Sequence, residues 1–176
     1  MRRKDREMDQ NFALYVVDKC EYAVISMVDP EGEPYCLPIT IVRSENTIYF
    51  HTAMEGRKID ILNSAPSVCM ACVGDTNPVP HKFTTEFESA IVTGTAYEVT
   101  EEAEKILALK LLCQRHASTN MKEFDRAVSK SLSRTGIWKI KIREITGKRK
   151  KYDRDGKEMK FGRMEQTKNN EEDNRK

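Results

Sequence analysis

Residues 51–62 read HTAMEGRKIDIL, and they place a strand end, a glycine and a helix start close together. The preceding residues 47–50, TIYF, are β-branched or aromatic, which favours a strand. Gly56 permits a tight turn. Ile59 and Leu62 are three residues apart, as on one face of a helix. The stretch therefore predicts a strand–glycine–helix junction.

Two cations, Arg57 and Lys58, fall in the first turn of this predicted helix. Positive charge there opposes the helix dipole and costs about 0.3–1 kcal/mol for each residue. A bound phosphate would reverse the sign of this effect, because it would meet free backbone N–H groups and both side chains. The alternative is that both cations simply extend into water. The charge pattern favours an anion site but does not distinguish the two by itself.

The rest of the chain is predicted to be mainly β. We expect strands at about residues 22–29, 35–42, 47–53, 67–74, 88–100 and 135–147. We expect helices at about residues 8–19, 56–66, 101–116 and 122–132. Turn residues at 30–34 and 44–46 suggest two successive hairpins, that is, an antiparallel meander. A closed or partly split β-barrel with peripheral helices would leave the fewest exposed strand edges.

The charge distribution separates a folded domain from a tail. The chain has a formal net charge of +2, and from Lys148 onward eleven lysines and arginines outnumber seven acids. Val, Ile and Leu are absent from this segment. We therefore expect a domain at 1–148 and a charged, disordered tail at 149–176. Because the positive excess lies in the tail, no nucleic-acid partner is expected.

Other features narrow the class of protein. No apolar run approaches the roughly 18 residues of a membrane helix, and the charged N-terminus is unlike a secretory signal. We therefore expect a cytoplasmic protein without a membrane partner, whose five cysteines are free thiols. Cys69 and Cys72 match C-x-x-C, but on a strand they would point to opposite faces, so no metal site is expected.

Several separate motifs together resemble the pyridoxamine 5′-phosphate oxidase-related family, and within it most closely the Nim-type 5-nitroimidazole resistance proteins. The motifs are RRKDRE (2–7), VDPEGEPYCLPI (28–39), IYFHTAMEGRKID (48–60), GDTNPVPHKFTTEFESAIVTG (74–94) and IKIREITGK (140–148). The resemblance implies an FMN-binding split β-barrel. It also implies a homodimer with FMN, or in some members FAD, at the subunit interface.

The resemblance also implies a set of flavin-binding residues. A first strand would lie along the isoalloxazine ring, and a second strand end would contact the ring or the ribityl chain. Two cations would hold the phosphate, and a third segment would close the site from the partner subunit. These residues are, in that order, Leu37, Pro38, Ile39 and Thr40; His51, Thr52 and Ala53; Arg57 and Lys58; and Phe87, Glu88 and Ser89. Nim-type proteins often have Tyr where this chain has Phe87, so a hydroxyl is missing here.

The expected function is that of a flavin-dependent oxidoreductase acting on a small molecule, with 5-nitroimidazole-type compounds as the substrate class. His51 is the candidate catalytic residue, as a proton donor, although a histidine on a strand is more often a structural hydrogen-bonding residue. The alternative is a non-catalytic flavin-binding or redox-sensing module, because the sequence contains no recognisable NAD(P)H site.

Overall fold

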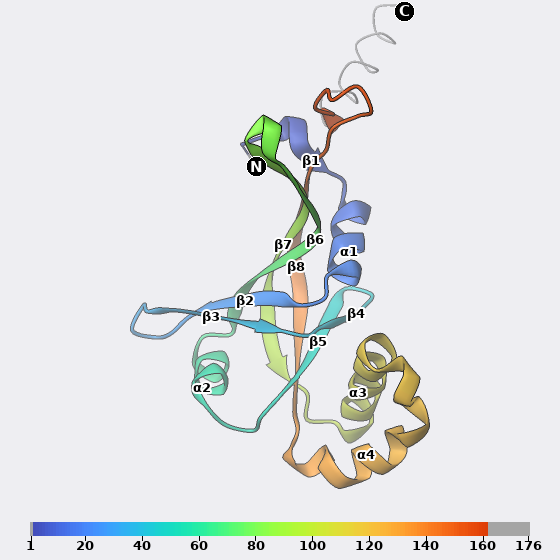
Figure 1. The fold of residues 1–176 in the computed structure, drawn as a ribbon. Coiled ribbons are helices and arrows are strands. Elements are labelled where there is room, and N and C mark those ends of the chain that lie inside the picture. The colour runs from blue at the N-terminus through green and yellow to red at the C-terminus, as the bar shows by residue number, and fades with distance from the viewer. Residues whose placement is uncertain (1, 162–176) are drawn as a thin grey trace, which may run out of the picture. The chain divides into compact units, whose positions relative to one another are not determined.

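The computed structural model describes residues 2–161, and it is mainly β, as predicted. The strands are β1 (Glu7–Met8), β2 (Ala23–Val28), β3 (Pro34–Ile39), β4 (Val42–Ser44), β5 (Thr47–Thr52), β6 (Ser67–Val79), β7 (Thr84–Glu98) and β8 (Gly136–Lys150). Their order in the sheet is β3-β2-β6-β7-β8-β5-β4, and β1 pairs with β8 (Figure 1).

The helices agree with the sequence prediction to within a few residues. They are α1 (Gln10–Lys19), α2 (Arg57–Ser64), α3 (Glu102–His116) and α4 (Phe124–Ser131). Short 3₁₀ turns lie at η1 (Lys4–Arg6), η2 (Pro80–Lys82), η3 (Ser118–Glu123) and η4 (Leu132–Arg134). No helix among the described residues is long and apolar enough to cross a membrane.

The chain divides into two compact units, which are described separately. Unit 1 contains residues 2–20, 72–91 and 145–161, and unit 2 contains residues 21–71 and 92–144. Strands β6, β7 and β8 contribute residues to both units.

The two predicted hairpins are present in unit 2, but the predicted meander is wrong. β2 pairs antiparallel with β3, and β4 pairs antiparallel with β5. However, β3 and β4 lie at opposite ends of the strand order. The predicted single strand 35–42 breaks after Ile39, where the buried–exposed alternation fails because Ile41 and Val42 are both buried. Between Ile39 and Val42 the chain therefore passes from β3, at one end of the strand order, to β4, at the other end.

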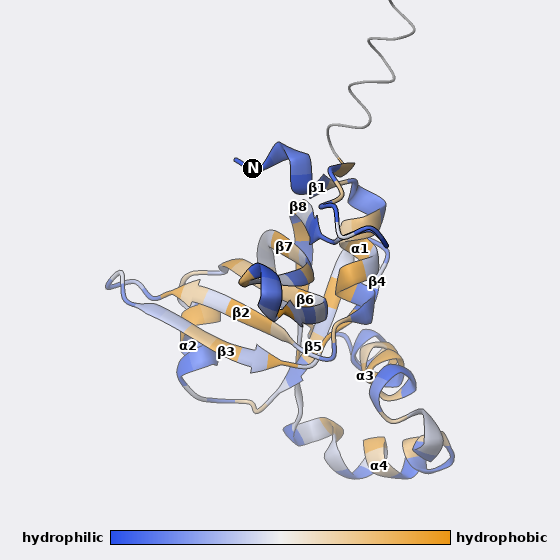
Figure 2. Cartoon of the chain, turned by 45° about the horizontal axis from the view of Figure 1, so that its top comes forward, coloured by the Kyte–Doolittle hydropathy of each residue, from blue (hydrophilic) through white to orange (hydrophobic). Residues whose placement is uncertain are grey.

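The core of unit 2 is formed by apolar residues of its strands and of α3. Alternate residues of β2 are buried, in keeping with the largely hydrophobic colouring of this strand in Figure 2. Ile48 and Phe50 of β5 are fully buried. α3 adds Ala108 and Leu112, which pack with Tyr49 in one cluster.

Unit 1 contains more regular structure than the sequence predicts. β6 continues to Val79 and β7 begins at Thr84, whereas the two strands were expected to end at residue 74 and to begin at residue 88. Most residues of this part of β6 are exposed, so the apolar alternation that identifies a strand is missing. The second half of β6 is therefore a strand because its backbone pairs with a neighbouring strand, and not because one of its faces is buried.

The predicted disordered tail is also structured at its beginning. β8 extends two residues beyond the expected domain end, to Lys150. Tyr152 then forms an antiparallel bridge with Glu158, and the Arg6 side chain donates a hydrogen bond of 2.6 Å to Glu158. The remainder of the predicted tail, from residue 162 onward, lies outside the described residues.

Candidate functional site

The predicted strand–glycine–helix junction is present in unit 2. β5 ends at Thr52, and Gly56 is the N-cap residue of α2, with φ 116° and ψ 166°. Its carbonyl oxygen accepts hydrogen bonds from the N–H groups of Ile59 (2.7 Å) and Asp60 (3.1 Å). No side chain of the described residues caps this helix, so the backbone N–H groups of Arg57 and Lys58 are available to a ligand.

Arg57 is positioned by the β2–β3 hairpin. Its Nη2 atom lies 3.3 Å from Oδ2 of Asp29, and its guanidinium carbon lies 4.8 Å from the ring centre of Tyr35. The side chain is nevertheless 56% exposed. The hairpin therefore holds the guanidinium at the helix start while leaving donors free for another anion.

The Lys58 ammonium lies near an aromatic ring of β5. Its Nζ atom lies 5.9 Å from the ring centre of Phe50, a buried residue of β5. Burial lowers the pKa of this lysine below its ordinary value, and no carboxylate among the described residues offsets that effect. A half-buried ammonium without a counter-ion is a suitable donor for an anionic group.

His51 is the exposed, second-last residue of β5, and the charge of Lys58 acts on it. Its pKa is lowered below the usual value by desolvation, and further by the positive charges of Lys58 and His116. The imidazole is therefore predominantly neutral at pH 7, with one N–H donor and one acceptor nitrogen. The flanking Thr52 is buried and Ala53 is exposed.

His116 is a residue that the sequence did not connect with the site. It is the last residue of α3, and its Nε2 atom donates a hydrogen bond of 2.8 Å to the carbonyl oxygen of Ile41. This hydrogen bond links the end of α3 to the segment that connects β3 with β4. Its charge contributes to the lowered pKa of His51, and no local motif of the sequence connects the two histidines.

The segment that was predicted to lie along the flavin ring belongs to β3, which stands at one end of the strand order. Leu37, Pro38 and Ile39 lie in β3, which pairs with β2, and Thr40 follows directly. Pro38 and Thr40 are exposed, whereas Ile39 is buried. A proline is compatible with an end strand because it has no N–H to donate. The link between β3 and α2 is the contact of Tyr35 with Arg57.

Phe87, Glu88 and Ser89 lie in a different unit from the other predicted residues. They are part of β7 in unit 1. Glu88 forms ion pairs with Lys19 (3.2 Å) and Arg149 (3.5 Å), and the Phe87 ring lies 5.5 Å from Nζ of Lys148. Glu88 thus already has a structural role within unit 1.

Solved structures of known proteins resemble the whole fold. One is a candidate 5-nitroimidazole antibiotic resistance protein of Bacteroides thetaiotaomicron VPI-5482, with 23% identity, a TM-score of 0.69, and coverage of 81% of this chain and 85% of that chain. A conserved hypothetical protein of Mycobacterium tuberculosis has 14% identity, a TM-score of 0.71, and coverage of 82% and 87%. An FAD-binding protein of Mesorhizobium loti has 15% identity, a TM-score of 0.59, and coverage of 82% and 96%.

These similarities define the fold as a split β-barrel with peripheral helices, as predicted. The sequence model of the family described as Pyridoxamine 5'-phosphate oxidase matches residues 12–149, and the chain belongs to this family. A comparison with curated proteins gives no match.

Proposed function

We propose that this protein binds FMN and acts as a flavin-dependent oxidoreductase on small molecules, with 5-nitroimidazole-type compounds as the substrate class. The observation that supports this proposal most directly is the start of α2. It combines uncapped backbone N–H groups with Arg57 and Lys58, in a chain of the pyridoxamine 5'-phosphate oxidase family. The candidate 5-nitroimidazole antibiotic resistance protein of B. thetaiotaomicron, which has the same fold, supports the substrate class.

In this proposal Arg57 and Lys58 hold the terminal phosphate. Arg57 is already oriented by Asp29 and Tyr35, so little side-chain freedom is lost on binding. Lys58 regains a favourable environment for its charge when the phosphate arrives. Each of these charge-assisted hydrogen bonds contributes about 1.5–3 kcal/mol. The same donors fit the phosphates of FAD, and FMN is proposed because one phosphate matches one helix start.

The remaining residues surround the flavin ring in the proposal. Leu37, Pro38, Ile39 and Thr40 lie along it, and His51, Thr52 and Ala53 contact the ring or the ribityl chain. A bound flavin supplies hydride and single-electron transfer at its ring. His51, as a neutral imidazole, donates one hydrogen bond and accepts a proton at its other nitrogen, which allows it to orient a substrate or move a proton.

We further propose a cytoplasmic homodimer in which Phe87, Glu88 and Ser89 of one copy complete the site of the other. Their location in unit 1, apart from the phosphate-binding residues of unit 2, is compatible with this arrangement. None of the five cysteines forms a disulfide in the described part of the chain, which suits a reducing compartment.

The enzymatic proposal is tested by anaerobic turnover of the FMN-loaded protein. We expect NADPH or NADH to bleach the flavin spectrum, and a 5-nitroimidazole to restore it with loss of the nitro absorbance. His51→Gln should slow reoxidation while FMN remains bound. A flavin that binds but is never reduced and reoxidised would contradict the enzymatic proposal and favour a flavin-binding or redox-sensing module.

A further inference from the structure

Strand β3 has a neighbouring strand on one side only. It stands at one end of the strand order, where it pairs with β2. Alternate residues of β3 are exposed, namely Pro34, Cys36 and Pro38. A strand with one neighbour and an exposed face opens locally more readily than a strand of the core. The position of β3 therefore depends on the side-chain contacts that it makes in addition to its pairing with β2.

Arg57, at the start of α2, contacts the β2–β3 hairpin at two points. Its Nη2 atom lies 3.3 Å from Oδ2 of Asp29 in the turn, and its guanidinium carbon lies 4.8 Å from the ring centre of Tyr35 in β3. The other carboxylate oxygen of Asp29 accepts a hydrogen bond of 2.8 Å from the N–H of Glu33, which fixes this side chain within the turn. One guanidinium thus joins both the turn and β3 to the helix start.

Tyr35 shares one face of β3 with Leu37. Side chains two residues apart on a strand point to the same face, and so do those of residues paired directly across a ladder. Tyr35 is paired with Met27 and Leu37 with Ile25, and both residues of β2 are buried. The face of β3 that contacts Arg57 therefore also carries Leu37, a residue of the segment proposed to lie along the flavin ring.

We propose that Tyr35 couples the two ends of the flavin site. An anion held by Arg57 fixes the guanidinium against the Tyr35 side chain, and this contact steadies residues 37–39 of β3. The inference rests on the proposed function, because it takes the start of α2 as the phosphate site and residues 37–40 as the flavin-ring contact. Tyr35 is a positioning residue, since it acts through Arg57 and β3. By reciprocity, a flavin ring that orders β3 also favours phosphate binding at Arg57.

The Tyr35 contact is better suited than the Asp29 ion pair to persist when phosphate is bound. The Asp29 carboxylate has the same sign of charge as phosphate and uses guanidinium N–H groups, whereas an aromatic ring contacts the face of the guanidinium and leaves those N–H groups free. The Arg57 side chain is 56% exposed, so solvent also weakens the ion pair. Tyr35 is therefore the residue through which phosphate binding reaches β3.

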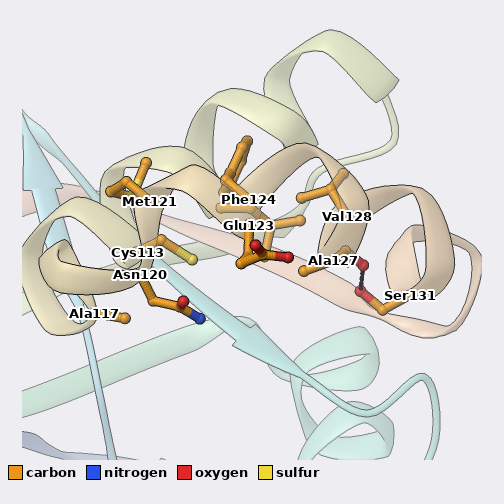
Figure 3. Close-up of a pocket in the computed structure, with 10 residues that line it drawn as sticks. Cys113, Ala117, Asn120, Met121, Glu123, Phe124, Ala127, Val128 and Ser131 are labelled. Carbon is orange, nitrogen blue, oxygen red and sulfur yellow. Dashed lines mark hydrogen bonds between the residues drawn. The ribbon is translucent and has the colours of Figure 1, made fainter.

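The cleft between α3 and α4 in the same unit does not compete for an anion. It has a volume of about 140 Å³ and a mostly apolar lining (Figure 3). Glu123 is its one charged lining residue, and this carboxylate is paired with Arg126 at 3.2 Å. The Ser131 hydroxyl donates a hydrogen bond of 2.9 Å to the carbonyl oxygen of Ala127. Because no cation lines this cleft, an anion added as a probe has no site there.

Hydrogen exchange with inorganic phosphate tests the coupling in the absence of a flavin ring. We expect saturating phosphate to slow exchange of the β3 amides about two- to fivefold in wild-type protein and in Tyr35→Phe, which keeps the aromatic ring. In Tyr35→Leu the β3 amides should not respond. Sodium chloride at the same ionic strength controls for screening. The NMR shifts of the Arg57 and Lys58 amides report in each sample whether phosphate is bound.

The preference for FMN over riboflavin provides the second measurement. Tyr35→Leu should lower this preference about two- to fivefold, and Tyr35→Phe should retain it. When Arg57→Ala is already present, Tyr35→Leu should have no further effect. Tyr15→Leu is the matched control, because Tyr15 is an exposed tyrosine of unit 1 that also has a cation, Lys19, over its ring. This variant should leave the preference unchanged.

Three results would each overturn the inference: slowed β3 exchange that persists in Tyr35→Leu, additive effects of Tyr35→Leu and Arg57→Ala, or a lost preference in Tyr35→Phe. If phosphate shifts the Arg57 and Lys58 amides but leaves β3 exchange unchanged, only this inference fails. If phosphate does not shift those amides, the proposed phosphate site fails and the inference fails with it.

Discussion

Neighbouring residues contribute to the lowered pKa of His51. Burial is the main cause of its lowered pKa, and the charges of Lys58 and His116 lower it further. Removing either charge should therefore raise the pKa of His51 toward 6.5, with a larger effect for Lys58→Gln than for His116→Gln. Histidine NMR titration measures these shifts, and Lys110→Gln, at an exposed position of α3, is the control. A pKa unchanged in both variants would contradict this electrostatic link.

The same shift gives a direction for the pH dependence of stability. Because the pKa of His51 is lower in the folded state, the unfolded state takes up a proton first as the pH falls below about 6.5. The contribution of His51 to stability is thus present above that pH and is lost as the pH falls through its folded pKa.

At the residue scale the sequence correctly predicted that a helix begins at Arg57, because that signal is local, whereas the binding roles of the site residues stay predictions. Arg57 and Lys58 stand out because two cations begin one helix. Asp29, Tyr35 and His116 could not be found in this way, because each approaches the site through contacts between residues distant in sequence. Their roles depend on the tertiary structure.

At the scale of elements, the start of α2 depends on Gly56. Its φ of 116° lies in the left-handed region, and a side chain there would meet no atom within 4 Å. Gly56→Ala should therefore lower the free energy of unfolding by about 1–2 kcal/mol through backbone strain alone. Because the strain falls on the residue that orients the first turn, FMN affinity should fall as well.

Gly32→Ala is the matched control for this prediction. Gly32 also has a positive φ, 90°, and open space around it, but it lies at the tip of the β2–β3 hairpin. Urea unfolding should show a similar loss of stability in both variants, whereas FMN titration should show weaker binding only for Gly56→Ala. Equal FMN affinity in the two variants would indicate that the start of α2 does not bind the phosphate.

Element prediction failed at the β3–β4 boundary for a physical reason. Residues 35–42 contain no glycine or charged residue that would break a strand, so the sequence predicts one continuous strand. The sheet order instead places its two parts at opposite ends. Hairpins are local and were predicted correctly, whereas the order of strands depends on long-range pairing.

At the scale of the whole molecule, the sequence motifs predicted the split-barrel fold and the family, both of which are confirmed. The division into two units could not be predicted, because three strands contribute to both. As a result, the predicted site residues are distributed over both units. The flavin, the dimer and the completion of the site by Phe87, Glu88 and Ser89 stay predictions.

The central claim is that the start of α2 holds a flavin phosphate, and a comparison of FMN with riboflavin tests it most directly, because riboflavin lacks only the phosphate. Binding of both ligands is measured for wild-type protein, for Arg57→Ala/Lys58→Ala, and for the control Arg154→Ala/Lys157→Ala, which removes two exposed cations of unit 1. We predict that wild type and control prefer FMN and that Arg57→Ala/Lys58→Ala loses this preference by about a hundredfold or more while riboflavin affinity is unchanged. An unchanged preference for FMN in that variant would contradict the claim.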